Sequence, residues 1–181
     1  MKKIWLVCFV IILALVASPA FAAKKKKSSG GFVQEIGAGI GILSYPGLDS
    51  GFLLSGHARK DLGDVMENLT LDIEGGFTLK KPSLGVSGFE TTYSLFYVGA
   101  YGTYNYEIDK KISVYGKGGL LFESDEFANS LFPTFNVTTS GVVFAIGGGA
   151  TYQIKKDMKG FAEWVDLGVT TVLRAGIIKP L

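Results

Sequence analysis

The stretch LTLDIEGGFTL, residues 69–79, alternates between two kinds of side chain along its whole length. One set of alternate positions holds Leu, Leu, Ile, Gly, Phe and Leu, and the other holds Thr, Asp, Glu, Gly and Thr. Successive side chains of a β-strand point to opposite faces of the sheet, whereas a helix would mix the two sets. The pattern therefore predicts a strand with one apolar face and one polar, charged face.

Similar segments of about ten residues recur from residue 31 onward, separated by turn-like or polar clusters. We expect strands at residues 32–43, 50–59, 69–79, 93–106, 112–123, 142–154, 160–166 and 170–179. The strand at 93–106 has aromatic residues in both sets of alternate positions, so we expect a bulge near Gly99 or Gly102. In this strand the outward set is predicted to be Phe96, Val98, Ala100, Tyr104 and Tyr106. Because Pro180 cannot donate to a ladder, the last strand is expected to stop before it.

The N-terminus has the three parts of a secretory signal peptide. Lys2 and Lys3 precede an uncharged apolar stretch at residues 4–17, and residues 18–22 end in a small-x-small pattern. This order predicts cleavage after Ala22, and the apolar stretch is shorter than the roughly 20 residues of a membrane-spanning helix. We therefore expect a signal peptide at residues 1–22, a flexible basic tail at 23–31 and a β-barrel at 32–181. The four lysines of the tail, residues 24–27, are expected to be solvated or to contact anionic headgroups or cell-wall polymer.

Composition limits the function classes. Removing 22 of 181 residues leaves 159, enough for one domain. Without Lys2 and Lys3 the chain has 16 basic and 16 acidic residues, so a neutral chain gives no support for nucleic-acid binding. Cys8 lies within the signal, so no disulfide or thiolate metal site is expected, and the single histidine, His57, argues against a transition-metal site.

The segments fit strands that cross a membrane. In lipid every backbone donor and acceptor must be paired internally, so a strand protein has to close on itself, and tilted strands of nine to eleven residues cross the apolar layer. Charged, turn-like connections at 60–68, 107–111 and 155–159 alternate with connections at 44–49, 80–90, 124–140 and 167–169. Three of the second set contain Gly, Pro, Ser and aromatic residues, and such an alternation of turns and loops is typical of outer-membrane barrels. Aromatic residues suited to the two interfaces lie near segment ends: Phe32, Phe52, Phe77, Tyr104, Tyr106, Phe122, Tyr152, Phe161 and Trp164. We predict an all-β fold, an eight-stranded antiparallel transmembrane up-and-down β-barrel with both ends at the periplasmic side.

Charged residues recur on the polar faces of these strands. The predicted inward set is Glu35, Arg59, Asp72, Glu74, Lys117, Glu163 and Arg174. An eight-stranded barrel is only wide enough inside for side chains to fill it, and an unpaired buried charge is costly. We therefore expect a paired network that plugs the lumen, without an open pore. The motif Gly37-x-Gly39-x-Gly41 lies within a strand, unlike a nucleotide-binding loop, and is expected to make room for Tyr97 or Tyr101.

The cleaved signal, the eight patterned strands, the glycine-rich first strand and the interior charges resemble the small outer-membrane β-barrel family that includes OmpA-like and OmpX-like proteins. The resemblance implies a monomer in the outer membrane, in contact with its lipids and assembled by the barrel-assembly machinery. It also implies a structural, adhesive or surface-interaction role. We expect no cofactor and no enzymatic activity. One departure concerns assembly, because the chain ends Ile178-Lys179-Pro180-Leu181 where family members end in an aromatic residue.

Two alternatives remain open from the sequence. Some small barrels of this type resemble lipid A deacylases or acyltransferases, and His57 could act with Ser55 and with Glu35 or Glu74, although Arg59 stands where such enzymes would carry a serine. A soluble barrel with its apolar face inward could instead carry an apolar ligand.

The predicted 124–140 loop is the main candidate surface for an extracellular ligand or protein. It carries four apolar side chains, Phe127, Leu131, Phe132 and Phe135, next to Asp125 and Glu126. The loop is expected either to fold over the barrel mouth or to bind a protein or lipid.

Overall fold

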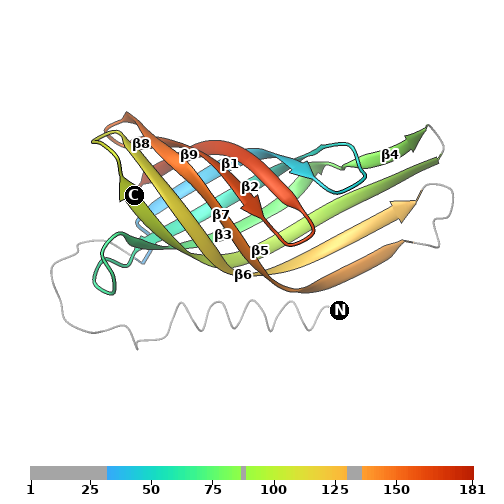
Figure 1. The fold of residues 1–181 in the computed structure, drawn as a ribbon, viewed down its shortest axis with the longest axis horizontal. Coiled ribbons are helices and arrows are strands. Elements are labelled where there is room, and N and C mark those ends of the chain that lie inside the picture. The colour runs from blue at the N-terminus through green and yellow to red at the C-terminus, as the bar shows by residue number, and fades with distance from the viewer. Residues whose placement is uncertain (1–31, 87–88, 130–135) are drawn as a thin grey trace. The chain divides into compact units, whose positions relative to one another are not determined.

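The computed structural model describes residues 32–86, 89–129 and 136–181, which belong to one compact unit, Gly31–Leu181. Nine strands form in this part of the chain (Figure 1): β1 (Glu35–Ser44), β2 (Gly51–Asp61), β3 (Leu69–Lys80), β4 (Ser83–Val86), β5 (Phe89–Glu107), β6 (Ile112–Asn129), β7 (Val137–Lys155), β8 (Met158–Asp166) and β9 (Thr171–Pro180). The described residues contain no helix long and apolar enough to cross a membrane. The predicted signal and basic tail lie outside the described residues.

Eight of these strands close a barrel. Each pairs antiparallel with its neighbours in the order β3-β2-β1-β9-β8-β7-β6-β5, and the additional β3–β5 pairing joins the two ends of the sheet. The short β4 continues along β5 beyond the end of β3. The eight-stranded antiparallel up-and-down barrel predicted from the sequence is therefore confirmed, and β1 begins at the end of the barrel where β9 finishes.

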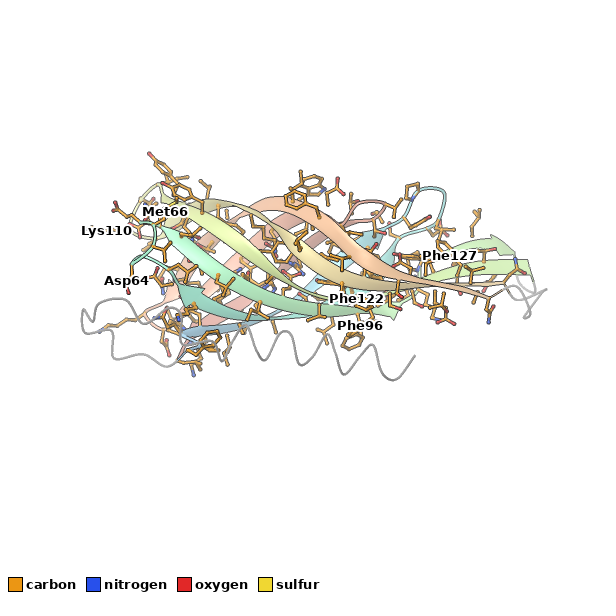
Figure 2. All side chains as sticks on the ribbon, turned by 90° about the horizontal axis from the view of Figure 1, so that it is seen from below. Asp64, Met66, Phe96, Lys110, Phe122 and Phe127 are labelled. Atoms are coloured by element: carbon orange, nitrogen blue, oxygen red, sulfur yellow. The ribbon has the colours of Figure 1, made fainter. Side chains whose placement is uncertain are left out.

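The apolar face of each strand points away from the lumen. Phe144 is 64% exposed and Leu173 58%, while Glu74 on the opposite face is 1% exposed. In Figure 2, Phe96 and Phe122 point away from the barrel wall. This arrangement contradicts the soluble alternative, which required the apolar face to line the interior. The outward set predicted for β5 is likewise half-buried or exposed.

The strands β5, β6 and β7 are 18 or 19 residues long and extend well beyond the nine-residue β8 (Figure 1). The prediction of a 124–140 loop is wrong for most of its length, because β6 continues to Asn129 and β7 begins at Val137. Phe127 lies within β6, opposite Val137, and not in a loop. The polar residues of this stretch resembled a loop because the outer wall here is no longer apolar. Leu131, Phe132 and Phe135 lie outside the described residues.

Two local predictions are also wrong. β5 pairs with β6 from Thr91 to Glu107 without a shift, so no bulge lies near Gly99 or Gly102. Its aromatic residues occupy both alternations because some of them fill the lumen. β9 also runs through Pro180, since Leu181 donates the next backbone hydrogen bond to the Gln34 carbonyl at 2.8 Å.

Candidate functional site

The centre of the lumen is built around the Glu74 carboxylate of β3. Lys117 of β6 donates to Glu74 Oε2 at 2.8 Å, and the Tyr97 hydroxyl of β5 donates to Glu74 Oε1 at 2.6 Å. Arg174 of β9 forms an ion pair with the same carboxylate. All four side chains are buried. Each arrives from a different strand, because each occupies an inward position of the alternating pattern.

A second carboxylate, Glu163 of β8, completes this central cluster. Its Oε1 accepts a hydrogen bond from Arg174 Nε at 2.6 Å, and its Oε2 lies 3.1 Å from Lys117 Nζ. The Tyr115 hydroxyl donates to Oε2 at 2.8 Å. Two carboxylates therefore share two cations, and the buried charges compensate one another.

Asp72 forms an adjoining pair with Arg59, whose Nε donates to Asp72 Oδ2 at 2.9 Å. His57 Nδ1 lies 3.3 Å from Asp72 Oδ2 and 3.7 Å from Glu74 Oε2, so the imidazole stands between this pair and the central cluster. The structure thus brings together six of the seven predicted residues. Their shared inward alternation was the sequence signal, and the same signal could have found His57, Tyr97 and Tyr115.

Glu35, the seventh predicted residue, lies apart from the others. Its carboxylate pairs with Lys159 Nζ at 2.8 Å, and both side chains keep partial solvent exposure. Lys159 was missed because it was assigned to the charged turn at 155–159, where a lysine is expected to be solvated, whereas β8 already begins at Met158.

An apolar cluster fills another part of the lumen, and the sequence analysis did not predict it. Its fully buried members come from nearly every strand: Leu43, Leu53, Tyr93, Leu95, Tyr97, Tyr101, Leu121, Ala145, Val165, Leu167 and Val172. Phe127 packs against it, with its ring centroid 5.0 Å from that of Tyr93 and 5.2 Å from that of Tyr45. The Tyr93 hydroxyl donates to Asp125 at 2.8 Å. These residues occupy the same alternate strand positions as the inward charged residues. The inward face therefore holds apolar as well as polar side chains, and polarity alone could not identify it.

The glycines of β1 admit bulky inward side chains, although not the tyrosines that were expected. A Cβ at Gly39 would lie 2.8 Å from Phe161 Cζ, and a Cβ at Gly41 would lie 2.6 Å from Arg174 Cβ. Phe161 therefore points into the lumen, against His57, and is not an interfacial aromatic residue. Tyr97 packs instead over Gly76, where an added Cβ would lie 2.6 Å from its ring.

Ser55, His57 and Asp72 form a row inside the barrel. Ser55 Oγ lies 3.4 Å from His57 Nε2, and His57 Nδ1 lies 3.3 Å from both Asp72 oxygens. This order resembles that of a nucleophile, a base and an orienting acid. All three side chains are buried, however, and Ser55 also lies within 3.4 Å of the Gly39 carbonyl. Ser55 is not among the residues that line the cavity at the end of the barrel described below.

His57, Glu74 and Glu163 each offer one ligand atom within 4.8 Å of the others. That donor set does not fit a metal ion, because Lys117 and Arg174 already occupy the space beside both carboxylates and would repel it.

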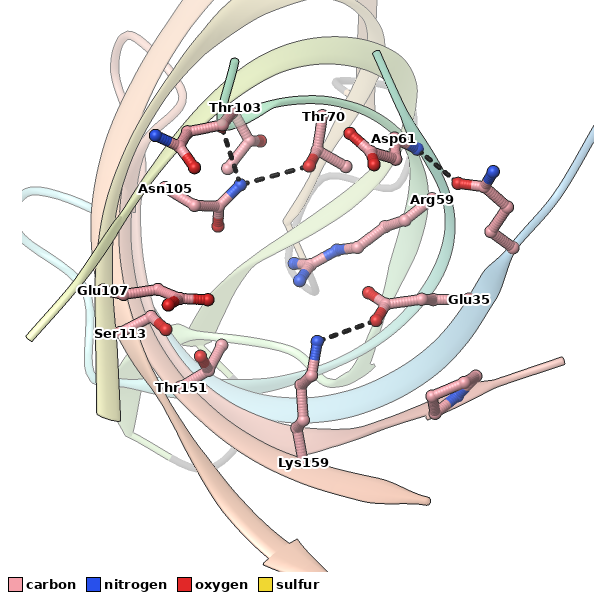
Figure 3. Close-up of a pocket in the computed structure, with 13 residues that line it drawn as sticks. Glu35, Arg59, Asp61, Thr70, Thr103, Asn105, Glu107, Ser113, Thr151 and Lys159 are labelled. Atoms are coloured by element: carbon pink, nitrogen blue, oxygen red, sulfur yellow. Dashed lines mark hydrogen bonds and ion pairs between the residues drawn. The ribbon is translucent and has the colours of Figure 1, made fainter. Parts of the chain in front are cut away.

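A cavity of about 430 Å³ opens at the end of the barrel where β1 begins (Figure 3). Its wall is polar and is contributed by Gln34, Glu35, Arg59, Asp61, Asn68, Thr70, Thr103, Asn105, Glu107, Ser113, Thr151, Lys159 and Pro180. Figure 3 shows Arg59 and Glu107 pointing into this space from different sides.

A closed barrel with an apolar outer wall and a charged, filled interior defines the class of membrane-spanning β-barrels. Residues 8–170 match the family described as "Outer membrane protein beta-barrel domain", and the chain belongs to this family. It is accordingly an outer-membrane protein that crosses the membrane with its strands. No curated protein sequence matches the chain.

Two solved structures have the same fold. Neisserial surface protein A is similar with a TM-score of 0.60 and 14% identity, over 81% of this chain and 95% of that one. A major outer membrane protein from Thermus thermophilus gives a TM-score of 0.52 and 14% identity, over 81% of this chain and 98% of that one.

Proposed function

We propose that this protein is a structural or surface-interaction protein of the outer membrane, with a plugged, non-conducting lumen. The carrying observation is the central cluster, in which Glu74 and Glu163 share Lys117 and Arg174. A permeating ion would have to separate these pairs. The fixed charges compensate one another, so the cluster offers an ion neither a free ligand nor a path.

The apolar cluster supports the same proposal. Leu53, Leu121 and Val172 fill the lumen on the inward side of the wall with exposures of 0–1%. These aliphatic side chains offer water and hydrated ions no polar partners. Two successive barriers of different chemistry, one charged and one apolar, thus stand in an interior that eight strands make only wide enough for side chains.

The buried row at Ser55 favours a non-enzymatic role. An enzyme acting on membrane lipids needs its nucleophile where an acyl chain or headgroup can reach it. Ser55 is 3% exposed and His57 is 5% exposed, and both face the lumen behind the barrel wall. The lipid-modifying alternative therefore lacks a route for its substrate.

The interaction surface is assigned to the projecting ends of β5, β6 and β7, opposite the end where β1 begins. Outward residues here are polar, as at Ser94, Glu126 and Ser140, in contrast to the apolar wall below them. This change of polarity supports a position outside the lipid, where an extracellular protein or ligand could be contacted. The protein is proposed to act as a monomer after export with a cleaved signal and insertion by the barrel-assembly machinery.

Conductance tests the plugged lumen. The refolded protein, shown to be folded by its heat-modified gel mobility, is incorporated into planar bilayers, with an open porin as the positive control. We expect no conductance steps above the bilayer background. Stable, reproducible steps from the folded protein would show that the lumen conducts and would refute the proposal.

A further inference from the structure

The cavity at the β1 end of the barrel is lined by a hydroxyl that has no partner within the described protein. The Thr103 hydroxyl lines this cavity and is buried, with 1% exposure of the residue, yet it has no hydrogen-bond partner among the described residues. Arg59 also lines the cavity, and its Nη2 forms an ion pair with Asp72 at 2.9 Å. Buried polar groups of folded proteins are nearly always satisfied. An unpartnered hydroxyl at the wall of a cavity indicates that a polar molecule completes it.

The charges around the cavity are separated by sign. Arg59 is a buried cation that is already paired with Asp72, and Glu107 is an exposed carboxylate for which no ion pair is found among the described residues. In Figure 3 these two groups point toward one another across the open space, and no ion pair joins them. Lys159 and Glu35 neutralise each other at the side of the cavity. The Asp61 carboxylate accepts a hydrogen bond from the backbone N–H of Gly63, two residues further along the chain, at 2.9 Å.

This arrangement of charges favours a ligand that carries both a positive and a negative charge over a simple anion or cation. A simple anion would gain from Arg59 but would meet the Glu107 carboxylate, and a simple cation would meet the opposite conflict. A molecule with both charges can satisfy both ends, because guanidinium groups bind carboxylates and carboxylates accept hydrogen bonds from ammonium groups. The volume of about 430 Å³ is within the range of roughly 300–1,000 Å³ of small-molecule pockets.

We propose that this cavity binds a small zwitterion, a free amino acid or a short peptide, with the ligand carboxylate on Arg59 and its ammonium group on Glu107. Thr103 supplies a hydroxyl to the carboxylate end. Asn105 and Thr70, which already share a hydrogen bond of 3.1 Å, form a polar wall beside it.

Calorimetric titration of alanyl-alanine into the folded protein in detergent micelles tests the site. N-acetyl-alanine, which lacks the ammonium group, and alaninamide, which lacks the carboxylate, are titrated in parallel. We expect saturable binding of alanyl-alanine and at least about tenfold weaker binding of both blocked compounds, since each loses a charge-assisted hydrogen bond.

Two variants test whether the ligand binds at the proposed residues. Glu107→Gln is expected to weaken alanyl-alanine binding at least about tenfold and to remove the preference over N-acetyl-alanine. Thr103→Val is also expected to weaken binding without lowering stability, because its hydroxyl has no partner in the described protein. Asp109→Asn, in the same turn as Glu107 but outside the cavity wall, is the matched control and should bind normally. Absence of saturable binding, equal binding of the blocked compounds, or unchanged binding by both variants would overturn the proposal.

Discussion

The Lys117 ammonium lies 2.8 Å from the Glu74 carboxylate, although β5 separates the strands that carry the two residues. The same ammonium lies 3.1 Å from Glu163 on β8, on the other side of the barrel. One side chain thus joins strands that share no backbone hydrogen bonds. The walls of the barrel are held at a fixed separation by these contacts as well as by the closed ladder.

Lys117→Met should strongly destabilise the barrel. It leaves two buried carboxylates with Arg174 alone, and loss of one partner of a buried pair typically costs roughly 3–5 kcal/mol. The measurement is urea unfolding in lipid vesicles, followed by Trp164 fluorescence. Lys159→Met is the matched control, because its pair with Glu35 is partly exposed and such pairs contribute about 1 kcal/mol or less. Equal losses of unfolding free energy in the two variants would show that the central cluster stabilises the barrel no more than the partly exposed pair does.

Gly41→Ala should destabilise the barrel by overpacking. The new Cβ would lie 2.6 Å from Arg174 Cβ and 3.0 Å from the Leu173 carbonyl oxygen, which belong to the adjacent strand. Overpacking of this kind costs about 1–3 kcal/mol. Gly116→Ala is the control, since nothing lies within 4 Å of its Cβ. Thermal unfolding in the same vesicles compares them, and a tolerated Gly41→Ala would mean that β1 and β9 can separate.

The inward positions of Glu74 and Lys117 were predictable because strand alternation needs only the sequence. Their partners were not, since a partner across the lumen depends on register and on the tilt of strands far apart in the chain. Gly41 illustrates the difference. Its small size was readable as room for a large side chain, yet only the pairing with β9 shows that Arg174 is the neighbour.

The extended end of the barrel was misread for a different reason. Leu53 and Leu121 lie on the same alternation as the charges, so the inward face changes from polar to apolar along the barrel. At the same end, outward residues such as Glu126 become polar. At this end apolar and polar side chains thus occur on both faces of the wall, and Phe127 looked like part of a loop although it packs inside.

Ile146→Lys tests the position of the membrane. Ile146 points outward from β7 and is 48% exposed, within the apolar wall. A lysine facing lipid costs about 2–4 kcal/mol at the bilayer midplane and about 0–1 kcal/mol near the interfaces. Ser140→Lys, on the same face of β7 but beyond the apolar wall, should unfold nearly as the parent does. Similar free energies of unfolding for both variants would contradict this membrane level.

His57→Ala should leave the lipid A of a producing host unchanged. The imidazole is enclosed by Asp72, Glu74 and Phe161, and its proposed nucleophile Ser55 is equally buried. Mass spectrometry of lipid A compares cells producing the parent, the variant or neither. An acyl change that requires both the protein and His57 would establish the lipid-modifying alternative. We also expect the variant to lose stability, because Asp72 loses a buried partner.

Asp109 gives the turn between β5 and β6 a dependence on pH. Its Oδ1 accepts the backbone N–H groups of Lys111 and Ile112 at 2.6 and 2.8 Å, and these hydrogen bonds hold the pKa of the exposed carboxyl below its ordinary value of 3.8. A depressed pKa in the folded state favours folding above the pKa of the unfolded chain. This contribution disappears as the pH falls through the folded value, because the protonated group accepts these bonds less well.

Asp109→Ala should therefore lower the urea midpoint slightly at neutral pH, and the difference from the parent should shrink below pH 3.8. Asp109→Asn keeps an acceptor oxygen but no titrating group, so its difference from the parent at neutral pH should be smaller than that of the alanine variant and should also shrink in acid. Unfolding in vesicles across this range measures both. If the difference in urea midpoint between Asp109→Ala and the parent grew larger in acid, the direction of pH dependence derived from these two hydrogen bonds would be contradicted.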